Sequence, residues 1–439
     1  MHYSGAVYRP PSEARSLIVQ CTLGCSHNKC AFCTMYKDKK FSINPIEQVL
    51  SDLDEARAYG RYIEKIFLAD GDALILPMDY LLTVLDYICD HFPTCKRVAA
   101  YATTKAIMRK TDDELRTLRE HGLGIVYIGL ESGNEELLKK FCKGVTAEEI
   151  VLNAIRCKQA GIATSVTAIN GMAGANGDWQ AHAIDTAKAV SRMKPDYIAF
   201  LTLRVYSGTP LHDWIASGEF KMMEPPELMR ETRLFLEHID SDGSIFRSNH
   251  ASNYLPLGGT LNRDREALIH TIDEALDVMT YDELVEAREQ LVVGKEVSEY
   301  ESLIDGVNPN FDPNVDNAYA RNCGGCAFAT WERLSGIDPQ AQADWRNIGT
   351  IGGMEEACDM RFADCAPNQL EQFARSQGPG WHGMCAMEWP PDGETGHWVN
   401  LATSETGHVY VLDSQCGEVS LLRDYVQENP AIRYHVNVR

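Results

Sequence analysis

The sequence predicts an α/β domain over residues 1–295, built as a partial (β/α)6 barrel of the TIM type, and a smaller α+β domain over residues 319–439. Six short apolar runs alternate with helical periodicity at intervals of roughly 30 residues, which is the rhythm of βαβ units in a parallel sheet. An Asn-, Asp- and Pro-rich stretch at 305–316 then breaks the periodicity, so residues 296–318 are expected to form a linker. With 439 residues and 44% hydrophobic content, the chain is long enough for two cores.

Each of the six units joins a predicted strand to a helix. The expected strands cover residues 16–20, 65–69, 97–101, 124–130, 164–169 and 197–203. The helical periodicity covers residues 45–59, 77–91, 111–121, 134–141, 147–160 and 181–193, and a longer helical stretch at 265–291 closes the domain. The same units opened out would form a doubly wound sheet. In both folds the functional groups lie on loops after the carboxyl ends of the strands.

The loop after the first strand contains four of the fourteen cysteines, in the sequence CTLGCSHNKCAFCTMY. Cys25, Cys30 and Cys33 form a C-x4-C-x2-C run, and thiolates this close on one loop can converge on one soft metal centre. Three ligands to a cluster of four irons would leave one iron open to another molecule. A zinc knuckle or a set of buried thiols is the alternative. Cys21 would be the fourth ligand, but its spacing fits no common zinc or ferredoxin site, so we interpret it as structural.

Polar residues also follow the other predicted strands. Asp70, Gly71 and Asp72 follow the second strand, and Glu131 follows the fourth. The remaining strands are followed by Thr103 and Thr104, by Asn170 and Gly171, and by Arg204. Six such loops that converge on one face form the arrangement that a site needs.

Five segments occur in order: CSHNKCAFC, ADGDA, YIGLESGNEELLKKFCKG, PDYIAFLTLRVYSGTPL and SNHASNYLPLGGTL. Through them residues 15–275 resemble the radical SAM superfamily, and within it the branch of oxygen-independent coproporphyrinogen oxidase and Elongator-like enzymes. Most of the superfamily has C-x3-C where this chain has C-x4-C, although some branches carry the longer loop.

This resemblance implies that Cys25, Cys30 and Cys33 bind a [4Fe-4S] cluster whose open iron chelates S-adenosylmethionine. Reductive cleavage would then give a 5′-deoxyadenosyl radical, with flavodoxin or ferredoxin as the expected electron donor. Asp70, Gly71 and Asp72 match the segment that holds the methionine ammonium. Glu131 matches the carboxylate that accepts hydrogen bonds from the ribose hydroxyls. The alternative for the Glu131 segment is a helix cap, with Ser132 at or near the N-cap.

In the second domain, Cys323 stands at the start of a helical stretch. The thiol would lie at a helix N-terminus, where the peptide dipoles favour a thiolate, and a nearby histidine would complete a Cys–His pair. The competing interpretation is metallic. It would use Cys323 and Cys326 with Cys358 and Cys365 for zinc, or with Cys385 or Cys416 for an auxiliary iron–sulfur cluster.

A predicted hairpin supplies an acid and a base for this thiol. Two apolar runs, 397–403 and 408–414, flank four turn residues. A turn centred near Glu405 would place His397 opposite Asp413 on the same face. An aspartate facing a histidine can orient the imidazole and stabilise its cation.

The motifs N-C-x2-C-x2-A-x2-E-R-L-x-G, HWVN and D-x-Q-x-G resemble the papain-fold toxin family, whose members are similar to glutamine deamidases. The resemblance implies a papain-like fold and a triad of Cys323, His397 and Asp413, with Gln415 as a further amide donor. Cys326 is the alternative nucleophile, because CGGCAFA also aligns with the active-site stretch of papain-type proteases.

Bulk properties narrow the class of protein. A net charge of −22 argues against a nucleic-acid backbone or an anionic membrane as the main partner. The start of the sequence has no apolar signal region and no run of 18 apolar residues occurs, so we expect a cytoplasmic protein with reduced thiols.

The expected function is a radical SAM enzyme with a C-terminal hydrolase or deamidase module, acting on a peptide or protein. One alternative is a radical SAM enzyme for a small metabolite, whose tail serves separately as an effector. In the other alternative the tail is an auxiliary metal-binding or protein-binding domain.

Overall fold

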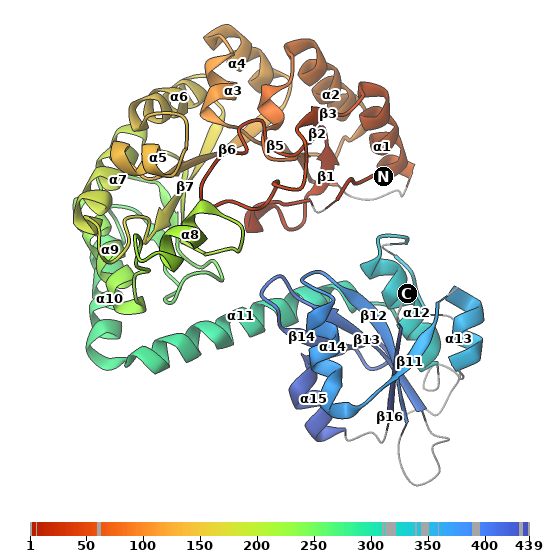
Figure 1. The fold of residues 1–439 in the computed structure, drawn as a ribbon. Helices are drawn as coiled ribbons and strands as arrows, with labels where there is room; N and C mark the ends of the chain where they lie inside the picture. The colour runs from red at the N-terminus through yellow and green to blue at the C-terminus, as the bar shows by residue number, and fades with distance from the viewer. Residues whose placement is uncertain are drawn as a thin grey trace. The chain divides into compact units, whose positions relative to one another are not determined.

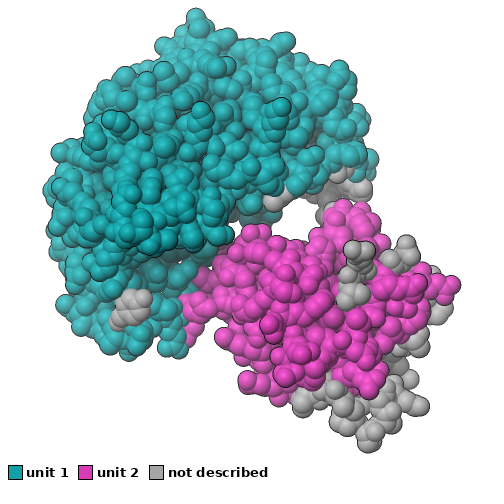
Figure 2. Space-filling model, viewed as in Figure 1, with its two compact units in different colours: residues 1–288 teal, residues 289–439 magenta. Residues whose placement is uncertain are grey.

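The chain divides into two compact units, residues 1–288 and residues 289–439 (Figure 2). The computed structural model describes residues 2–5, 7–58, 63–309, 311, 322–338, 340–343, 351–358, 360–388, 396–429 and 433–437, without the side chains of 281, 287, 291, 357 and 358. Helix α11 (Tyr281–Ile304) crosses the division, so the start of the expected linker, residues 296–304, is helical. Most of the remaining linker, 310 and 312–318, lies outside the described residues. No helix of the described chain is long and apolar enough to cross a membrane.

Unit 1 contains an eight-stranded sheet in the order β1-β4-β5-β6-β7-β8-β9-β10 (Figure 1). Its strands are β1 (Leu17–Gln20), β4 (Lys65–Ala69), β5 (Arg97–Tyr101), β6 (Leu123–Glu131), β7 (Ala163–Asn170), β8 (Tyr197–Thr202), β9 (Ile245–Arg247) and β10 (Gly258–Thr260). Neighbours are parallel from β1 to β9, and β10 is antiparallel to β9. A small separate ribbon pairs β2 (Thr22–Leu23) with β3 (Ser42–Ile43).

This strand order decides between the two predicted topologies. A doubly wound sheet reverses its strand order at a switch point. Here the strands follow one another in chain order, so the doubly wound alternative is excluded and the six predicted strands are confirmed as β1 and β4–β8. Among the described strands no pairing joins β10 back to β1, so closure into a barrel is not shown.

Helices connect the parallel strands, and Figure 1 shows α1, α2, α4, α6 and α7 along the outer side of the sheet. The helices of unit 1 are α1 (Ile46–Ala58), α2 (Met78–His91), α3 (Thr104–Met108), α4 (Asp112–Glu120), α5 (Glu135–Lys140), α6 (Ala147–Gln159), α7 (Trp179–Met193), α8 (Pro210–Ala216), α9 (Pro225–His238) and α10 (Arg265–Val278), with short 3-10 turns η1 (Pro11–Glu13) and η2 (Ala73–Ile75). The single helix predicted over 265–291 is instead α10 followed by α11. Thr280 and Glu283 form the reciprocal bonds of a capping box there, which starts a new helix.

The sheet of unit 1 has an apolar core on each face. The larger core packs the outer face against the helices and includes Val19, Leu68, Val126 and Val190. The inner face carries Phe67 and Tyr127, whose rings meet edge to face with centroids 6.0 Å apart. Strands buried on both faces read as continuous apolar runs, which is why the sequence reveals them.

Unit 2 is an antiparallel sheet of six strands in the order β11-β16-β12-β13-β14-β15. The strands are β11 (Phe362–Cys365), β12 (His382–Glu388), β13 (Gly396–Thr403), β14 (Val409–Asp413), β15 (Glu418–Leu421) and β16 (Arg433–Asn437). The helices are α12 (Cys323–Leu334), α13 (Ile351–Cys358), α14 (Leu370–Ser376) and α15 (Leu422–Glu428), with a 3-10 turn η4 (Pro367–Gln369). One apolar cluster joins the sheet to α14 and α15, and two others join it to α12.

Candidate functional site

The cysteine loop of unit 1 is held by backbone bonds to two segments distant in sequence. The amide of Ala31 donates to the carbonyl of Phe141 at 3.0 Å, and the amide of Leu211 donates to the carbonyl of Ala31 at 3.1 Å. The ring of Phe32 packs against Phe141 with centroids 6.0 Å apart. The aromatic residue before the last cysteine therefore anchors the loop to the end of α5.

The thiols of this loop lie close enough to influence one another. Burial raises the pKa of Cys30 to about 11, and the charges of Cys33 and Cys25 contribute to that rise. Burial also raises the pKa of Cys33, with a contribution from Cys25. Cys21 is fully buried in the outer core, and burial raises its pKa to about 12. Cys25 therefore lies near enough to Cys30 and to Cys33 to affect their pKa, whereas Cys21 belongs to the outer core.

Asp70 connects the loop after β4 to the start of the cysteine loop. Its Oδ2 accepts hydrogen bonds from Gly24 N at 3.0 Å and Gln20 Nε2 at 3.1 Å, and Lys39 Nζ lies 3.1 Å away. Its Oδ1 is buried and has no hydrogen-bond partner within the described part of the chain. A buried carboxylate oxygen without a donor is costly unless a ligand or water satisfies it.

Gly71 lies against the cysteine loop where a side chain cannot fit. A Cβ built there would lie 2.6 Å from the ring of Tyr36 and 3.0 Å from the Cβ of Cys25. The backbone therefore approaches the thiols as closely as packing allows. With the free oxygen of Asp70 and the grouped thiols, this close approach fits a metal cluster with a bound polar ligand.

Asp72 has no free oxygen for a ligand. Its Oδ1 accepts from Thr103 N at 2.9 Å, and its Oδ2 accepts from Thr103 Oγ1 at 2.9 Å and from Ser26 Oγ. Burial raises the pKa of this carboxyl, partly offset by these hydrogen bonds. Asp72 thus ties the cysteine loop to the loop after β5, and a direct contact with a ligand is a weaker interpretation for it than for Asp70.

Glu131 ends β6 in a left-handed backbone conformation, with φ of 63°, beside an irregularity in the pairing with β7. Such conformations are uncommon for residues other than glycine and cluster at functional sites. Its Oε1 lies 2.7 Å from Nζ of Lys143, a residue that sequence reasoning missed. Burial disfavours the Lys143 cation, but the charges of Glu131, Cys30 and Cys25 raise its pKa overall.

The helix-cap alternative for the Glu131 segment is confirmed to the extent that Ser132 lies near the N-cap, because its Oγ accepts from Asn134 N at 3.0 Å. The N-cap of α5 is Asn134, whose side chain accepts from Leu137 N at 3.2 Å. Ser132 is also bonded to the buried His182 at 2.8 Å, which in turn lies 3.1 Å from Glu231. The buried pair of His182 and Glu231 therefore holds the loop after β6 in place through Ser132.

The polar residues at the end of β7 and after β8, and Asn253 farther along the chain, form hydrogen bonds within the protein. Asn170 donates to Thr232 at 2.5 Å, and Asn253 is buried and donates to the carbonyl of Phe200 at 2.8 Å. Arg204 donates to the carbonyl of Ala251 at 3.3 Å. The cysteine loop itself is bonded to the loop after β4 through Ser26, to the segment after β6 through His27 and Ala31, and to the start of α8 through Ala31.

In unit 2 the structure brings Cys323, His397 and Asp413 together, from the first residue of α12, the start of β13 and the end of β14. Nε2 of His397 lies 2.5 Å from Oδ2 of Asp413, and the ring also forms a hydrogen bond with the thiol of Cys323. Burial lowers the pKa of His397, but the hydrogen bonds and charges of Asp413 and Cys323 raise it overall to about 10. At neutral pH the imidazole is therefore a cation between the sulfur of Cys323 and the carboxylate of Asp413.

The predicted hairpin is present, but its predicted register is wrong by two residues. Thr403 pairs with Val409, so a three-residue loop centres one residue later than expected. Gly407, with φ of 88°, closes this loop in a conformation that favours glycine. Asp413 is a diagonal neighbour of His397 and not its direct partner. Diagonal neighbours share a face and remain within reach of long side chains.

Cys326 differs from Cys323 in its surroundings. It is 1% exposed, its thiol lies 3.4 Å from Oδ1 of Asn322, and burial raises its pKa strongly. A buried thiol with a raised pKa is a poor nucleophile. Of the two candidates, Cys323 is the one that contacts His397.

The metal interpretation of the tail finds little support in the described cysteines. Cys365 and Cys385 belong to the core beside α14 and α15, whereas Cys326 belongs to a core beside α12. Cys416 is exposed, and the side chain of Cys358 lies outside the described residues. Cys323 and Cys416 lie near enough to Cys326 to raise its pKa, but Cys365 and Cys385 lie in another core, so the described thiols do not all converge on one centre.

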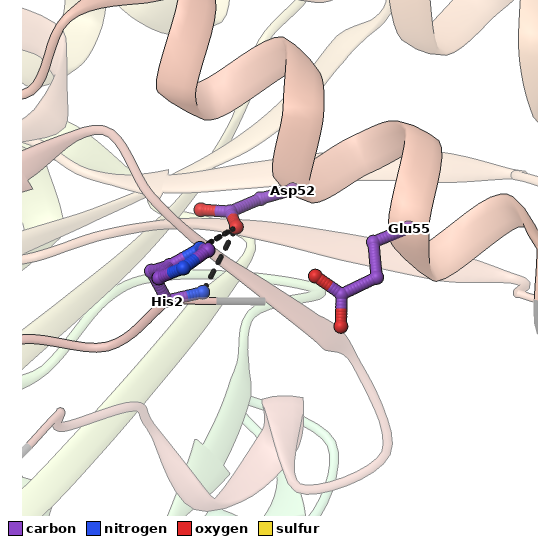
Figure 3. Close-up of side chains that lie close together, drawn as sticks. All are labelled: His2, Asp52 and Glu55. Carbon is purple, nitrogen blue, oxygen red and sulfur yellow. Dashed lines mark hydrogen bonds and ion pairs between the residues drawn. The ribbon is translucent and has the colours of Figure 1, made fainter.

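A group of possible metal ligands lies elsewhere in unit 1. His2, Asp52 and Glu55 place three ligand atoms within 4.8 Å of one another (Figure 3). The backbone amide and Nδ1 of His2 already contact Oδ1 of Asp52 at 2.8 and 3.0 Å. These bonds tie the first residues to α1, away from the strand-end loops, so we assign the group no part in the site.

Two family models match the chain. Residues 19–187 match the radical SAM superfamily, and residues 321–418 match papain fold toxin 1, glutamine deamidase. Among curated proteins, the uncharacterized protein MJ0486 of Methanocaldococcus jannaschii is 22% identical over 232 residues, which cover 49% of this chain and 69% of that protein.

Solved structures resemble the chain at low identity. The radical S-adenosylmethionine methyltransferase TsrM from Kitasatospora setae, with cobalamin and [4Fe-4S] cluster bound, is 19% identical with a TM-score of 0.39 over 47% of this chain and 41% of that chain. Elp3 from Methanocaldococcus infernus is 16% identical with a TM-score of 0.38 over 60% of this chain and 64% of that chain. The chain thus spans about two fifths of the TsrM structure that it matches.

Proposed function

The chain carries a radical SAM domain followed by a papain-fold toxin domain of the glutamine deamidase type, and we propose that it combines two chemistries. Unit 1 would generate a radical from S-adenosylmethionine. Unit 2 would hydrolyse a carboxamide through Cys323. The observation that carries the second part is the contact of one imidazole, His397, with both a thiol and a carboxylate.

In unit 1, the proposed ligands of a [4Fe-4S] cluster are Cys25, Cys30 and Cys33. Such a cluster, when bound, supplies the electron that reductively cleaves S-adenosylmethionine, with flavodoxin or ferredoxin as the proposed donor. The unpartnered oxygen of Asp70 would accept a hydrogen bond from the methionine ammonium. Glu131 would bind the ribose hydroxyls, with Lys143 holding its carboxylate in place.

In unit 2, the imidazolium of His397 would stabilise the thiolate of Cys323, which attacks the carbonyl carbon of a carboxamide. His397 then donates a proton to the departing ammonia, and a thioester to Cys323 remains. Water, deprotonated by His397, hydrolyses the thioester to a carboxylic acid, which restores the thiolate and the imidazolium. The acid then releases its proton to solvent. Asp413 keeps the ring oriented and stabilises its charge.

The proposed substrate class for both units is a peptide or protein side chain. A glutamine side chain offers unit 2 its carboxamide, and a carbon–hydrogen bond of the same polypeptide offers unit 1 a hydrogen atom. Small-metabolite chemistry in unit 1 with an independent tail is the competing outcome, and a tail that only binds protein is another.

The test for unit 1 uses anaerobically reconstituted full chain. We expect about four irons per chain, as a cubane cluster requires, and cleavage of S-adenosylmethionine. The triple variant with alanine at Cys25, Cys30 and Cys33 should lose both. If that variant keeps its iron, the assignment of the cluster is wrong.

The test for unit 2 measures the reactivity of the Cys323 thiol and the release of ammonia. We expect iodoacetamide to alkylate Cys323 faster than the other tail cysteines, and ammonia release from glutamine-containing peptides to require Cys323. Unchanged ammonia release in Cys323→Ala would assign the tail to binding only. Zinc retained stoichiometrically by the full chain, and lost on mutation of the tail cysteines, would favour the metal interpretation.

A further inference from the structure

The side chain of Asn308 joins two loops of unit 2. It follows α11 and lies outside the 321–418 match to the deamidase family. Its Nδ2 donates to Oδ1 of Asn322 at 3.3 Å and to the carbonyl of Gln415 at 3.2 Å. Its Oδ1 accepts from Nδ2 of Asn322 at 3.4 Å. One amide therefore makes a reciprocal pair with one loop and a third bond to another.

Both partners of Asn308 lead directly to the proposed triad. Asn322 is the fully buried N-cap residue immediately before Cys323. The backbone amide of Gln415 donates to Oδ1 of Asp413 at 3.2 Å, while Oδ2 of Asp413 faces the imidazole. Asn308 thus connects the segment that carries the nucleophile to the segment that carries the acid.

The turn that carries Asn308 is itself fixed within unit 2. Val307 is fully buried in the core beside α12, and its carbonyl accepts from Ala343 N at 2.8 Å. The guanidinium of Arg333, on α12, donates to the carbonyls of Leu303 and Asp305 at 2.8 Å each. These contacts therefore hold in place the turn from which the side chain of Asn308 extends.

We propose that Asn308 is a positioning residue of the Cys323–His397–Asp413 site, an inference that rests on the deamidase function proposed above. By bonding Asn322 and the carbonyl of Gln415, it fixes the start of α12 relative to the loop after β14. The segment that supports the site then includes the turn after α11, which precedes residue 321, where the family match begins.

Only an amide satisfies this position. The carboxylate of Asn308→Asp keeps the shape and the acceptor but loses both donated bonds. It would also face two carbonyl-type oxygens, those of Asn322 and Gln415, which repel a negative charge. The separation of the two loops should then change, and the imidazole should no longer align with both partners at once.

The test measures the rate of Cys323 alkylation by iodoacetamide in the full chain between pH 5 and 9, resolved by peptide mass spectrometry. We expect Asn308→Asp to lower this rate at least fivefold at neutral pH and to change the shape of the pH profile. The matched control is Asn429→Asp, because Asn429 donates only locally, to the carbonyl of Tyr425 at 3.2 Å. It should leave the rate unchanged.

The fully buried thiol of Cys385 serves as an internal reporter of unfolding. If Asn308→Asp exposes Cys385 to the reagent, the residue is merely structural and the inference is overturned. An unchanged Cys323 rate in Asn308→Asp would also overturn it. If Cys323 of the unmodified chain reacts no faster than the other tail cysteines, the deamidase proposal itself fails, so the two failures are distinguishable.

Discussion

The charge of His397 is the property of unit 2 that a single substitution tests most directly. In the folded chain its pKa is about 10, against 6.5 for an ordinary histidine. Since each tenfold change in proton affinity is worth about 1.4 kcal/mol, the folded state would favour the protonated ring by about 5 kcal/mol. Asp413→Asn keeps the shape and removes the carboxylate. Without that charge burial dominates, and the pKa should fall.

This shift has a defined effect on stability. Below pH 6.5 both folded and unfolded chains hold the proton, so the contribution of His397 is complete. Above pH 6.5 the unfolded chain releases its proton first, and the free energy of unfolding of unit 2 falls until the pH reaches about 10. In Asp413→Asn this fall between pH 6.5 and 10 should largely disappear.

The assay is an NMR titration of the histidine rings in the full chain, with His397 assigned by its absence in His397→Gln. Urea unfolding at pH 6.5, 8 and 9.5 gives the matching stabilities. The control is Asp364→Asn, which removes a carboxylate 2.9 Å from another histidine of the same sheet, His435. A His397 that titrates near 6.5, or whose titration ignores Asp413→Asn, would refute the reasoning.

Further substitutions test unit 1. Gly71→Ala should reduce iron incorporation severalfold in anaerobic reconstitution, because its Cβ would lie within 3.0 Å of the cysteine loop; Gly294→Ala, with open space around its Cβ, should have no effect. Lys143→Gln should weaken S-adenosylmethionine binding about tenfold in calorimetry, because Glu131 loses a partner at 2.7 Å, and undiminished binding would contradict its role. Cys21→Ala should retain full iron content, and loss of one iron would make this thiol a ligand.

Periodicity alone predicted the strands of the first domain, whereas the choice between its two possible topologies needed the observed strand order. The run at 65–69 recurs as β4, because a strand buried on both faces must be apolar throughout. The same reasoning missed the break at Thr280. A capping box of two exposed side chains interrupts a helical pattern without changing its apolar positions.

The candidate sites were predictable only where neighbours in sequence are also neighbours in space. The spacing of Cys25, Cys30 and Cys33 predicts their grouping, and the helix start predicts the place of Cys323. Lys143 carried no signal in the sequence beyond the glycine that follows it, although in the structure both its neighbours, Cys142 and Gly144, have positive φ. Neither neighbour indicates that the side chain of Lys143 contacts the carboxylate of Glu131.

The sequence by itself indicated two candidate sites in the chain, through residue types at fixed local spacing. Tertiary structure decided which of these residues have free atoms. Within the described part of the chain, it satisfied both oxygens of Asp72 and left Oδ1 of Asp70 without a hydrogen-bond partner. It also displaced Asp413 by two residues in register, yet kept it 2.5 Å from His397. Such outcomes depend on packing between segments far apart in the chain, which no local pattern records.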